Sequence, residues 1–217
     1  ARELLADVAP GHELAGVGAA TLGVPFDDRV ELAPTFPGWG DLPFGRLIRD
    51  AFSGVPVRLA NDVKAAAAAE VRWGALTGCD PGIYLNLGTG LATAIVAGGT
   101  VISGAHGASG EIGYNVRTAA DVWADPQERT ILEHVVSGQA LETTGSAQLG
   151  RPVTAADVFA IAETRAEAAV LTEQFNRELA MHVVNLATAV DPSRIVVGGG
   201  LVGAWDRIAP DLRRALN

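Results

Sequence analysis

A run of apolar and glycine residues at positions 83–115 constrains the fold of this chain more than any other part of the sequence. It begins with alternating apolar and polar residues, breaks at Gly88-Thr89-Gly90, continues as a second apolar run, and turns at Gly98-Gly99. This pattern predicts two strands joined by a tight turn, a hairpin, and a glycine-rich loop that carries Glu111. Because glycine has no Cβ atom, backbone N–H groups in such turns can approach an anion closely. We therefore expect the Gly88-Thr89-Gly90 turn to hold phosphate oxygens.

The composition is that of a folded protein without the charge of a nucleic-acid binder. Of the 217 residues, 48% are hydrophobic and 19% are charged, and the length suits one large domain or two smaller lobes around a cleft. The formal net charge is -9 and no cluster of Lys and Arg residues is present, whereas nucleic-acid binding needs a positive field. A small phosphate ligand is compatible with this charge because backbone amides and a magnesium ion can hold it.

Cysteine content and hydropathy favour a cytoplasmic protein. The single cysteine, Cys79, allows no intramolecular disulfide and no zinc site built from cysteines. The first residues lack the basic segment and apolar core of a secretory signal, and no apolar run reaches the about 18 to 20 residues that span a bilayer. The histidines are scattered without metal-binding spacing, at His12, His106, His134 and His182.

An Asn-Asp pair, Asn61-Asp62, lies between a predicted strand at residues 55–60 and a predicted alanine-rich helix at residues 63–73. In α/β proteins, ligands bind where strands end and helices begin, which is the position of this pair. Asn and Asp are also favoured helix caps, so the pair has a second, purely structural interpretation. The turn-rich residues 74–82 then separate two predicted lobes, at residues 1–78 and 79–217.

The remaining pattern is that of alternating helices and strands. Apolar residues at helical spacing predict helices at residues 1–8, 42–53, 130–144, 154–162 and 166–190, and a last helix from about residue 204. Apolar runs predict strands at residues 14–24, 30–32 and 194–197. Residues 34–40 are predicted to form a structured loop with an aromatic tip, and residues 116–129 to be irregular and polar. The last strand runs into Gly198-Gly199-Gly200, a second place for close approach to a ligand, although a glycine turn of this kind is often only structural.

Several motifs stand in a fixed order along nearly the whole chain: GVGAATLGVP, the PGW loop, NDVKAAAAAE, LGTG, GAHGASGEIGY, LEHVVSG and the triple glycine. As an ordered set they resemble the ROK family (repressor, open reading frame, kinase), whose kinases belong to the actin-like sugar-kinase superfamily. The resemblance implies an α/β chain with a two-lobed actin-like, ribonuclease H-like ATPase fold. It also implies transfer of phosphate from ATP to a sugar hydroxyl, with Mg²⁺.

The same resemblance implies a role for each polar motif residue. By that likeness, Asp62 is the general base and Asn61 contacts a sugar hydroxyl. Glu111 and Glu133 would be carboxylates that bind further hydroxyls, a use that suits their acceptor-only oxygens. The alternative is a solvated charge, on a loop for Glu111 and on a helix for Glu133.

The glycine motifs would bind the nucleotide. The resemblance implies that Gly88, Thr89 and Gly90 face the phosphates, and that Gly198, Gly199 and Gly200 face the adenosine. Phosphoryl transfer depends mostly on positioning and charge compensation, so amide-rich turns, Mg²⁺ and one carboxylate suffice for it.

The chain departs from the family pattern in its metal ligands and in its extent. Many members bind zinc through a histidine and three cysteines, but the corresponding positions here are Tyr114, Ala124, Pro126 and Ile131. We therefore expect no zinc, and we expect Tyr114 to offer the sugar a phenol instead of an imidazole. Lys64 stands where the family usually has an Asn. The family's first phosphate motif, an aspartate followed by paired glycines and a threonine, does not occur, so we expect the fold to be incomplete at both ends.

Three functions are compatible with these residues. The first is a glucokinase-like, ATP-dependent kinase acting on a hexose or a related sugar. The second is the effector domain of a sugar-sensing ROK transcriptional repressor without kinase activity, and the third is an inactive sugar-binding scaffold. We expect a small-molecule sugar as partner, no membrane, no nucleic acid contacted by this portion, and a homodimer or higher homo-oligomer. Sequence upstream of Ala1 would separate the classes, because a repressor's DNA-binding helices would precede it.

Overall fold

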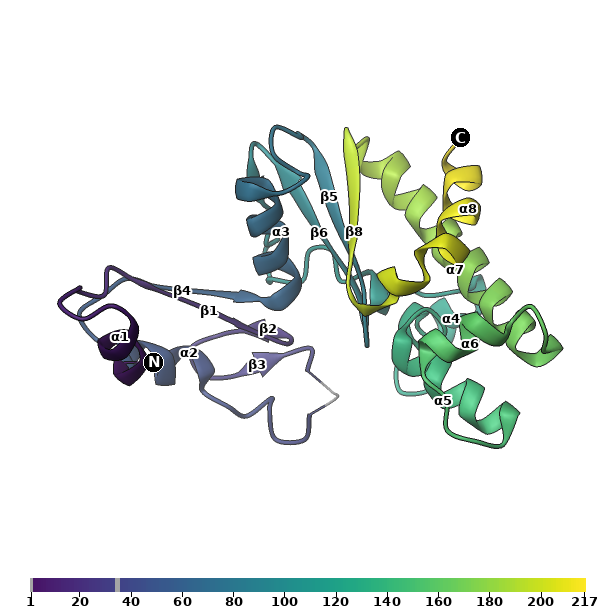
Figure 1. Ribbon diagram of the computed structural model, residues 1–217, viewed down its shortest axis with the longest axis horizontal. Helices are drawn as coiled ribbons and strands as arrows, with labels where there is room; N and C mark the ends of the chain where they lie inside the picture. Colours follow the sequence, from purple (N-terminus) through teal and green to yellow (C-terminus); the bar gives the residue numbers. More distant parts are fainter. Residues whose placement is uncertain (1, 34–35) are drawn as a thin grey trace. The chain divides into compact units, whose positions relative to one another are not determined.

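The computed structural model describes residues 2–33 and 36–217, and the chain divides into two compact units (Figure 1). Unit 1 is Ala1–Ala65 and unit 2 is Ala66–Asn217, so the division falls inside helix α3 (Asp62–Trp73). The predicted boundary between residues 78 and 79 was based on turn composition and stays a prediction. The loop predicted at residues 34–40 includes Pro34 and Thr35, which lie outside the described residues.

Unit 1 is built on two parallel strands, β1 (Val17–Thr21) and β4 (Val57–Asn61), whose last residues Thr21 and Asn61 are paired. Gly23, at φ +70°, turns the chain from β1 into the short antiparallel pair β2 (Val24–Pro25) and β3 (Val30–Glu31). A Cβ atom at Gly23 would lie 2.5 Å from the Glu31 carbonyl oxygen, so only glycine fits this turn. The strand expected at residues 14–24 is therefore shorter than predicted. Helices α1 (Arg2–Val8) and α2 (Phe44–Ala51) complete the unit.

Unit 2 contains a four-stranded sheet in the order β7-β6-β5-β8. Strands β5 (Gly82–Leu87), β6 (Leu91–Ala97) and β7 (Thr100–Val101) are antiparallel neighbours, and β8 (Arg194–Gly198) runs parallel to β5. Gly98 and Gly99 take positive φ angles of 61° and 70° at the β6–β7 turn, as a tight hairpin requires. The predicted strand, glycine turn, strand and hairpin are confirmed. β5 is paired on both sides, and its run of apolar residues is almost wholly buried.

Unit 2 also contains several helices and short 3-10 turns. The helices are α4 (Ala119–Trp123), α5 (Gly138–Leu149), α6 (Ala155–Ile161), α7 (Ala166–Val190) and α8 (Trp205–Leu216), with 3-10 turns η1 (Ile112–Tyr114), η2 (Leu132–His134) and η3 (Gly200–Ala204). In Figure 1, α5 to α8 lie on one side of the sheet. The long helix predicted at residues 166–190 is confirmed with those bounds. On its buried face Phe175 meets Phe159 edge-on, with ring centroids 5.5 Å apart.

The helix predicted at residues 130–144 is wrong. Only η2 forms before a break at Ser137, whose extended backbone starts α5 at Gly138. The Ser137 hydroxyl accepts a hydrogen bond from the Ala140 N–H at 3.0 Å and donates one to the Glu133 carbonyl at 2.8 Å. Ser137 is therefore an N-cap, and apolar spacing alone could not distinguish one helix from two.

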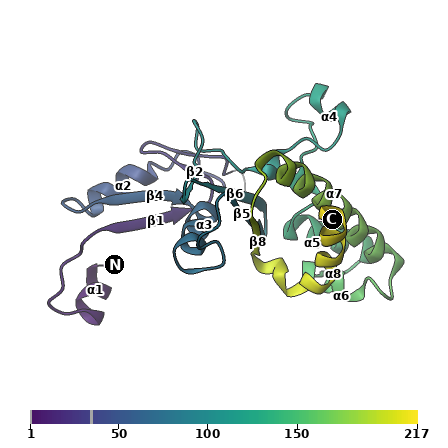
Figure 2. The ribbon, with the colours of Figure 1, turned by 90° about the horizontal axis from the view of Figure 1, so that it is seen from above.

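Residues 116–129 are also more regular than predicted, because they contain α4. Thr118 and Asp121 form a reciprocal capping box at its start. Figure 2 shows α4 standing away from α5, α6 and α8. None of the helices in residues 2–33 and 36–217 is both long and apolar enough to cross a membrane.

Candidate active site

The Asn61-Asp62 pair lies in unit 1, at the end of β4 and the start of α3. Asn61 is 5% exposed, and its Oδ1 accepts a hydrogen bond from the Lys64 N–H at 2.8 Å, which is the geometry of a helix N-cap. Asp62 is exposed, and its Oδ1 accepts from the Val63 N–H at 2.9 Å. The structural interpretation therefore holds for Asn61, while the Asp62 carboxylate faces solvent at a helix amino end.

Thr21 is a neighbour of this pair that the sequence did not single out. It is 6% exposed at the end of β1, directly beside Asn61 in the parallel ladder. Its hydroxyl accepts a hydrogen bond from the Trp39 indole N–H at 3.0 Å, so the tryptophan of the PGW loop covers this end of the two strands. In the sequence, the available signal for this residue was a threonine that follows a run of small residues in a predicted strand.

The glycine turn, Gly88-Thr89-Gly90, joins β5 to β6 in unit 2 and is closed by a hydrogen bond of 3.0 Å from the Gly88 N–H to the Gly90 carbonyl. The first residues of α5 hold it from one side. The Gly138 N–H donates to the Gly88 carbonyl at 2.8 Å, and the Gln139 N–H donates to the Thr89 carbonyl at 3.1 Å.

The direction of these carbonyls fixes the direction of the neighbouring amides. In a trans peptide the C=O and the following N–H point in opposite directions. Because the Gly88 and Thr89 carbonyls point at α5, the N–H groups of Thr89 and Gly90 point away from it. Thr89 is exposed, so the turn presents these two donors on its open side. Two such N–H groups form the kind of cradle that binds an anion.

The carboxylate loop, residues 110–115, is fixed to β6 by its first residue. Gly110 has φ +85°, and its carbonyl accepts hydrogen bonds from the Thr93 N–H at 2.7 Å and the Thr93 hydroxyl at 2.9 Å. A Cβ atom at Gly110 would lie 2.2 Å from the Thr93 carbonyl oxygen, so the loop requires glycine here. The turn η1 then follows, with Glu111 just before it and Tyr114 at its end.

Tyr114 is 39% exposed and carries a perturbed phenol. Burial raises the pKa of Tyr114 above its ordinary value, and the negative charges of Glu133 and Glu111 raise it further. The phenol therefore stays protonated at neutral pH and is a hydrogen-bond donor. The three predicted substrate residues of unit 2 thus share one electrostatic environment.

Glu133 is partly buried on η2, and its carboxylate is not a solvated helical charge. Its Oε2 accepts a hydrogen bond from the Leu91 N–H at 2.7 Å, directly after the glycine turn. Cβ atoms at Gly90 and Gly113 would lie 2.6 Å and 3.2 Å from the same oxygen. The carboxylate therefore occupies the space between the glycine turn and the carboxylate loop.

The triple glycine follows β8 beside the glycine turn. Gly198 pairs with Asn86 across the parallel strands, so both glycine segments leave the sheet at the same end. Gly199 has φ +97°, and a Cβ atom there would lie 2.3 Å from the Leu87 carbonyl oxygen. Gly200 opens η3, and a Cβ atom there would have no neighbour within 4 Å. The structure thus brings together two glycine segments that are more than one hundred residues apart.

A family model described as "ROK family" matches residues 5–217 of the chain. The chain belongs to the ROK family. The chain is 36% identical over 177 residues to the bifunctional enzyme NanE/NanK of Brucella melitensis, an alignment that covers 81% of this chain and 32% of that protein. It is 30% identical over 204 residues to the kanosamine kinase of Amycolatopsis mediterranei, covering 93% of this chain and 66% of that protein.

Solved structures confirm the predicted actin-like α/β fold. A ROK hexokinase from Thermus thermophilus matches with a TM-score of 0.79 and 31% identity, over 99% of this chain and 76% of that chain. A ROK family transcriptional regulator shares the fold at 24% identity and a TM-score of 0.78, so the fold does not separate kinases from regulators. This ROK chain spans 32% of the NanE/NanK length and 66% of the kanosamine kinase length, less than two thirds of either.

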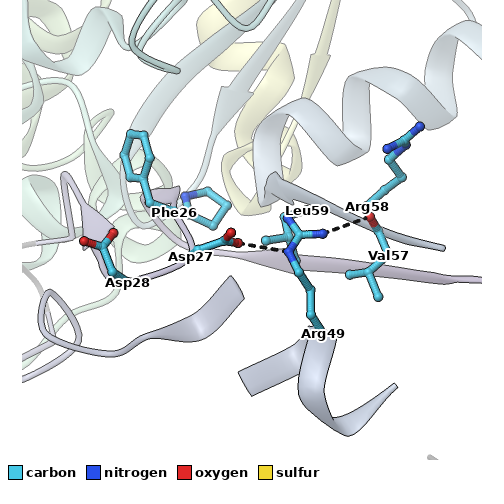
Figure 3. A pocket seen from close by; sticks show the side chains of 8 residues that line it. Phe26, Asp27, Asp28, Arg49, Val57, Arg58 and Leu59 are labelled. Atoms are coloured by element: carbon cyan, nitrogen blue, oxygen red, sulfur yellow. Dashed lines mark hydrogen bonds and ion pairs between the residues drawn. The ribbon is translucent and has the colours of Figure 1, made fainter. Parts of the chain in front are cut away.

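An open surface hollow in unit 1 holds none of the predicted site residues (Figure 3). It is lined by Pro25, Phe26, Asp27, Asp28, Arg49, Val57, Arg58 and Leu59. The Arg49 guanidinium points at the Asp27 carboxylate, donating to it at 2.9 Å, and also donates to the Val57 carbonyl at 3.4 Å. These contacts join α2 to β4 and to the turn between β2 and β3, which is a structural role.

The described residues can be compared with two kinds of predicted ligand, a phosphate group and a metal ion. The glycine turn fits a phosphate, because its open side carries two N–H donors. Among the described residues, no three His, Cys, Asp or Glu side chains are grouped so as to hold a metal ion. The absence of zinc stays a prediction.

Proposed function

We propose that this ROK protein is an ATP-dependent kinase that phosphorylates a hexose or a closely related sugar. The observation that carries the proposal is the glycine turn, whose two outward N–H groups lie next to the Glu133 carboxylate and beside the triple glycine. This contact supports a phosphate site at the turn with a hydroxyl-binding carboxylate directly beside it. The kanosamine kinase and ROK hexokinase named among the similar proteins support the same reaction class.

The nucleotide would bind to unit 2 through its backbone. The N–H groups of Thr89 and Gly90 suit the phosphates, and the Gly198-Gly199-Gly200 segment suits the adenosine. ATP supplies the phosphoryl group, and Mg²⁺ supplies charge compensation. The protein's own contribution at this site is to hold the amides in place before the nucleotide arrives.

The sugar would bind through hydroxyl acceptors and one donor. Glu111 and Glu133 accept hydrogen bonds from sugar hydroxyls, Tyr114 donates one, and Asn61 contributes a further contact. Asp62 accepts the proton of the attacking hydroxyl as the new O–P bond forms, and ADP leaves with the electrons of the broken bond. An exposed carboxylate at the amino end of a helix is free to approach such a hydroxyl.

A coupled ADP-release assay on the full-length gene product, over a panel of hexoses and amino sugars, tests this proposal. We expect at least one sugar to raise ATP turnover, and Asp62→Asn to lower kcat by about 10² to 10⁴ fold, the usual worth of a general base. Asp50→Asn changes an equally exposed aspartate on α2 and is the matched control. If no sugar raises turnover, the kinase function is wrong. If both variants lose activity equally, the assignment of Asp62 as the general base is wrong.

The repressor and scaffold functions stay predictions, since both would use the same sugar-binding residues. Isothermal titration separates them from the kinase: a repressor effector domain or a scaffold would bind sugar without binding Mg-ATP. The expected homo-oligomer and the cytoplasmic location likewise stay predictions.

A further inference from the structure

Glu133 contacts the glycine turn through a direct hydrogen bond to its backbone. The Leu91 N–H, the first amide after the turn, donates to Glu133 Oε2 at 2.7 Å. A carboxylate that accepts a backbone N–H makes a charge-assisted hydrogen bond, which is stronger than one between neutral groups. The Glu133 side chain thus contacts the backbone directly after the last residue of the turn.

The residues that follow Glu133 hold the remainder of the same turn. Ser137 donates its hydroxyl to the Glu133 carbonyl at 2.8 Å, which links the carboxylate-bearing residue to the start of α5. The next two amides, of Gly138 and Gln139, donate to the two turn carbonyls at 2.8 Å and 3.1 Å. One short segment, 133–139, therefore fixes the turn through both its side chains and its backbone.

The same carboxylate also limits the position of the carboxylate loop. A Cβ atom at Gly113 would lie 3.2 Å from Glu133 Oε2 and 3.3 Å from its Cβ, so η1 packs directly against this side chain. In addition, a Cβ atom at Gly90 would lie 2.6 Å from Oε2. The Glu133 carboxylate lies in the space that the missing side chains of Gly90 and Gly113 leave between the two segments.

We propose that Glu133 is a positioning residue that holds the glycine turn in its nucleotide-binding geometry, whether or not a sugar is present. This inference rests on the proposed function, which identifies the ligand as a nucleotide. It gives Glu133 a second role beside the sugar binding that the family resemblance implies. A residue that only binds sugar would affect nucleotide binding only when sugar is bound. A positioning residue affects it in the sugar-free protein.

Titration calorimetry of the full-length gene product with a non-hydrolysable Mg-ATP analogue, without sugar, tests this distinction. We expect Glu133→Ala and the shortened Glu133→Asp to weaken nucleotide binding by about 10 to 100 fold, the range a hydrogen bond to a charged group spans as an equilibrium constant. Glu133→Gln keeps a carbonyl oxygen that can accept the Leu91 N–H, so it should bind the nucleotide within a few fold of the parent while its KM for sugar rises. Glu128→Gln changes an exposed glutamate that precedes η2, and this control should leave sugar-free nucleotide binding unchanged.

Unchanged nucleotide affinity in Glu133→Asp and Glu133→Ala would overturn the proposal and leave Glu133 as a sugar ligand alone. Hydrogen exchange at the Leu91 amide provides a readout that does not depend on any ligand. We expect faster exchange in Glu133→Asp and parent-like exchange in Glu133→Gln, and equal exchange in both would also overturn the proposal. If the parent protein binds no nucleotide, the proposed function fails, and the Leu91 exchange still decides whether Glu133 positions the turn.

Discussion

At the scale of single residues, two neighbouring glycines of the triple glycine differ sharply in what they tolerate. Gly199 combines φ +97° with a backbone oxygen 2.3 Å from a would-be Cβ atom, whereas Gly200 has open space around it. We expect Gly199→Ala to lower the free energy of unfolding by at least about 1 to 3 kcal/mol, from the strained backbone conformation alone. Gly200→Ala should stay within about 0.5 kcal/mol of the parent.

Urea denaturation of both variants measures this difference. The pair controls for glycine-specific effects on the unfolded chain, because the two substitutions are chemically identical and adjacent. Equal unfolding free energies for the two variants would show that the Leu87 carbonyl does not constrain this position.

By the family resemblance, Tyr114 stands where many ROK members have a histidine. Because its pKa is raised, the phenol stays a donor throughout the neutral and mildly alkaline range. We expect Tyr114→Phe to raise the KM for sugar by about 5 to 10 fold, the worth of one neutral hydrogen bond, with little change in the KM for ATP. Steady-state kinetics against both substrates measures this, and equal changes in the two KM values would contradict a contact with the sugar.

At the scale of elements, α7 supports the segment that leaves the carboxylate loop. Arg117 donates two hydrogen bonds of 2.5 Å to Glu178, with only 20% and 17% of the two side chains exposed, and Asn115 contacts the His182 ring at 3.2 Å. Burial raises the pKa of Glu178, but the hydrogen bonds from Arg117 and Gln174 outweigh it, so the pKa lies below its ordinary value. Two side chains of α7, Glu178 and His182, thus hold the end of the carboxylate loop and the residues that follow it.

The sign of this shift predicts how the contribution of Glu178 varies with pH. A carboxyl group whose pKa is depressed by folding stabilises the protein fully above its unfolded pKa of about 4.3, and loses that contribution as pH falls through the lower folded pKa. We expect Glu178→Gln to lower the free energy of unfolding by about 1 to 3 kcal/mol at pH 7. The difference in unfolding free energy between the variant and the parent should decrease as the pH falls below about 4.3.

Glu173→Gln is the control for this measurement, because Glu173 pairs with Arg177 on the exposed face of the same helix, at 66% and 75% exposure. Such surface pairs contribute about 0 to 1 kcal/mol. Unfolding followed by circular dichroism at several pH values measures both variants. A gap for Glu178→Gln that stays constant down to about pH 3, below the unfolded pKa, would contradict the assigned ion pair.

Elements differ in how far the sequence could predict them. The bounds of α7 follow from 25 residues of regular apolar spacing ended by Asp191-Pro192. The break at Ser137 could not be predicted from spacing, because the contacts that decide it join Gly138 to Gly88 and Glu133 to Leu91, more than forty positions apart. Periodicity reports which face of a helix is buried, but not which distant backbone atoms its first turn must reach.

At the scale of the whole molecule, the order of motifs was sufficient for the family and the fold. The site residues and their functions stay predictions that rest on the family resemblance. The sequence implied that Glu133 was a sugar ligand, and the structure adds its bond to the turn. Asn61 and Asp62 belong to unit 1, so their relation to the residues of unit 2 rests on the family resemblance.

The two units should also differ in local stability. In unit 2, β5 is paired on both sides and Ile83, Leu85 and Leu87 are each at most 1% exposed. In unit 1, β1 pairs with β4, and its residues from Val17 to Ala20 alternate between partly buried and exposed. We expect β5 amides to exchange hydrogen much more slowly than β1 amides in this chain. Equal protection in native-state exchange would contradict this ranking.

The central claim is that the protein transfers phosphate to a sugar, and following the γ-phosphate of labelled ATP tests it most directly. The full-length gene product, incubated with Mg-ATP and a sugar that raises turnover, should place the label on the sugar, with one sugar phosphate formed for each ADP. The Asp62→Asn variant should form almost none. Label recovered only as inorganic phosphate, or the same yield from Asp62→Asn, would contradict the account.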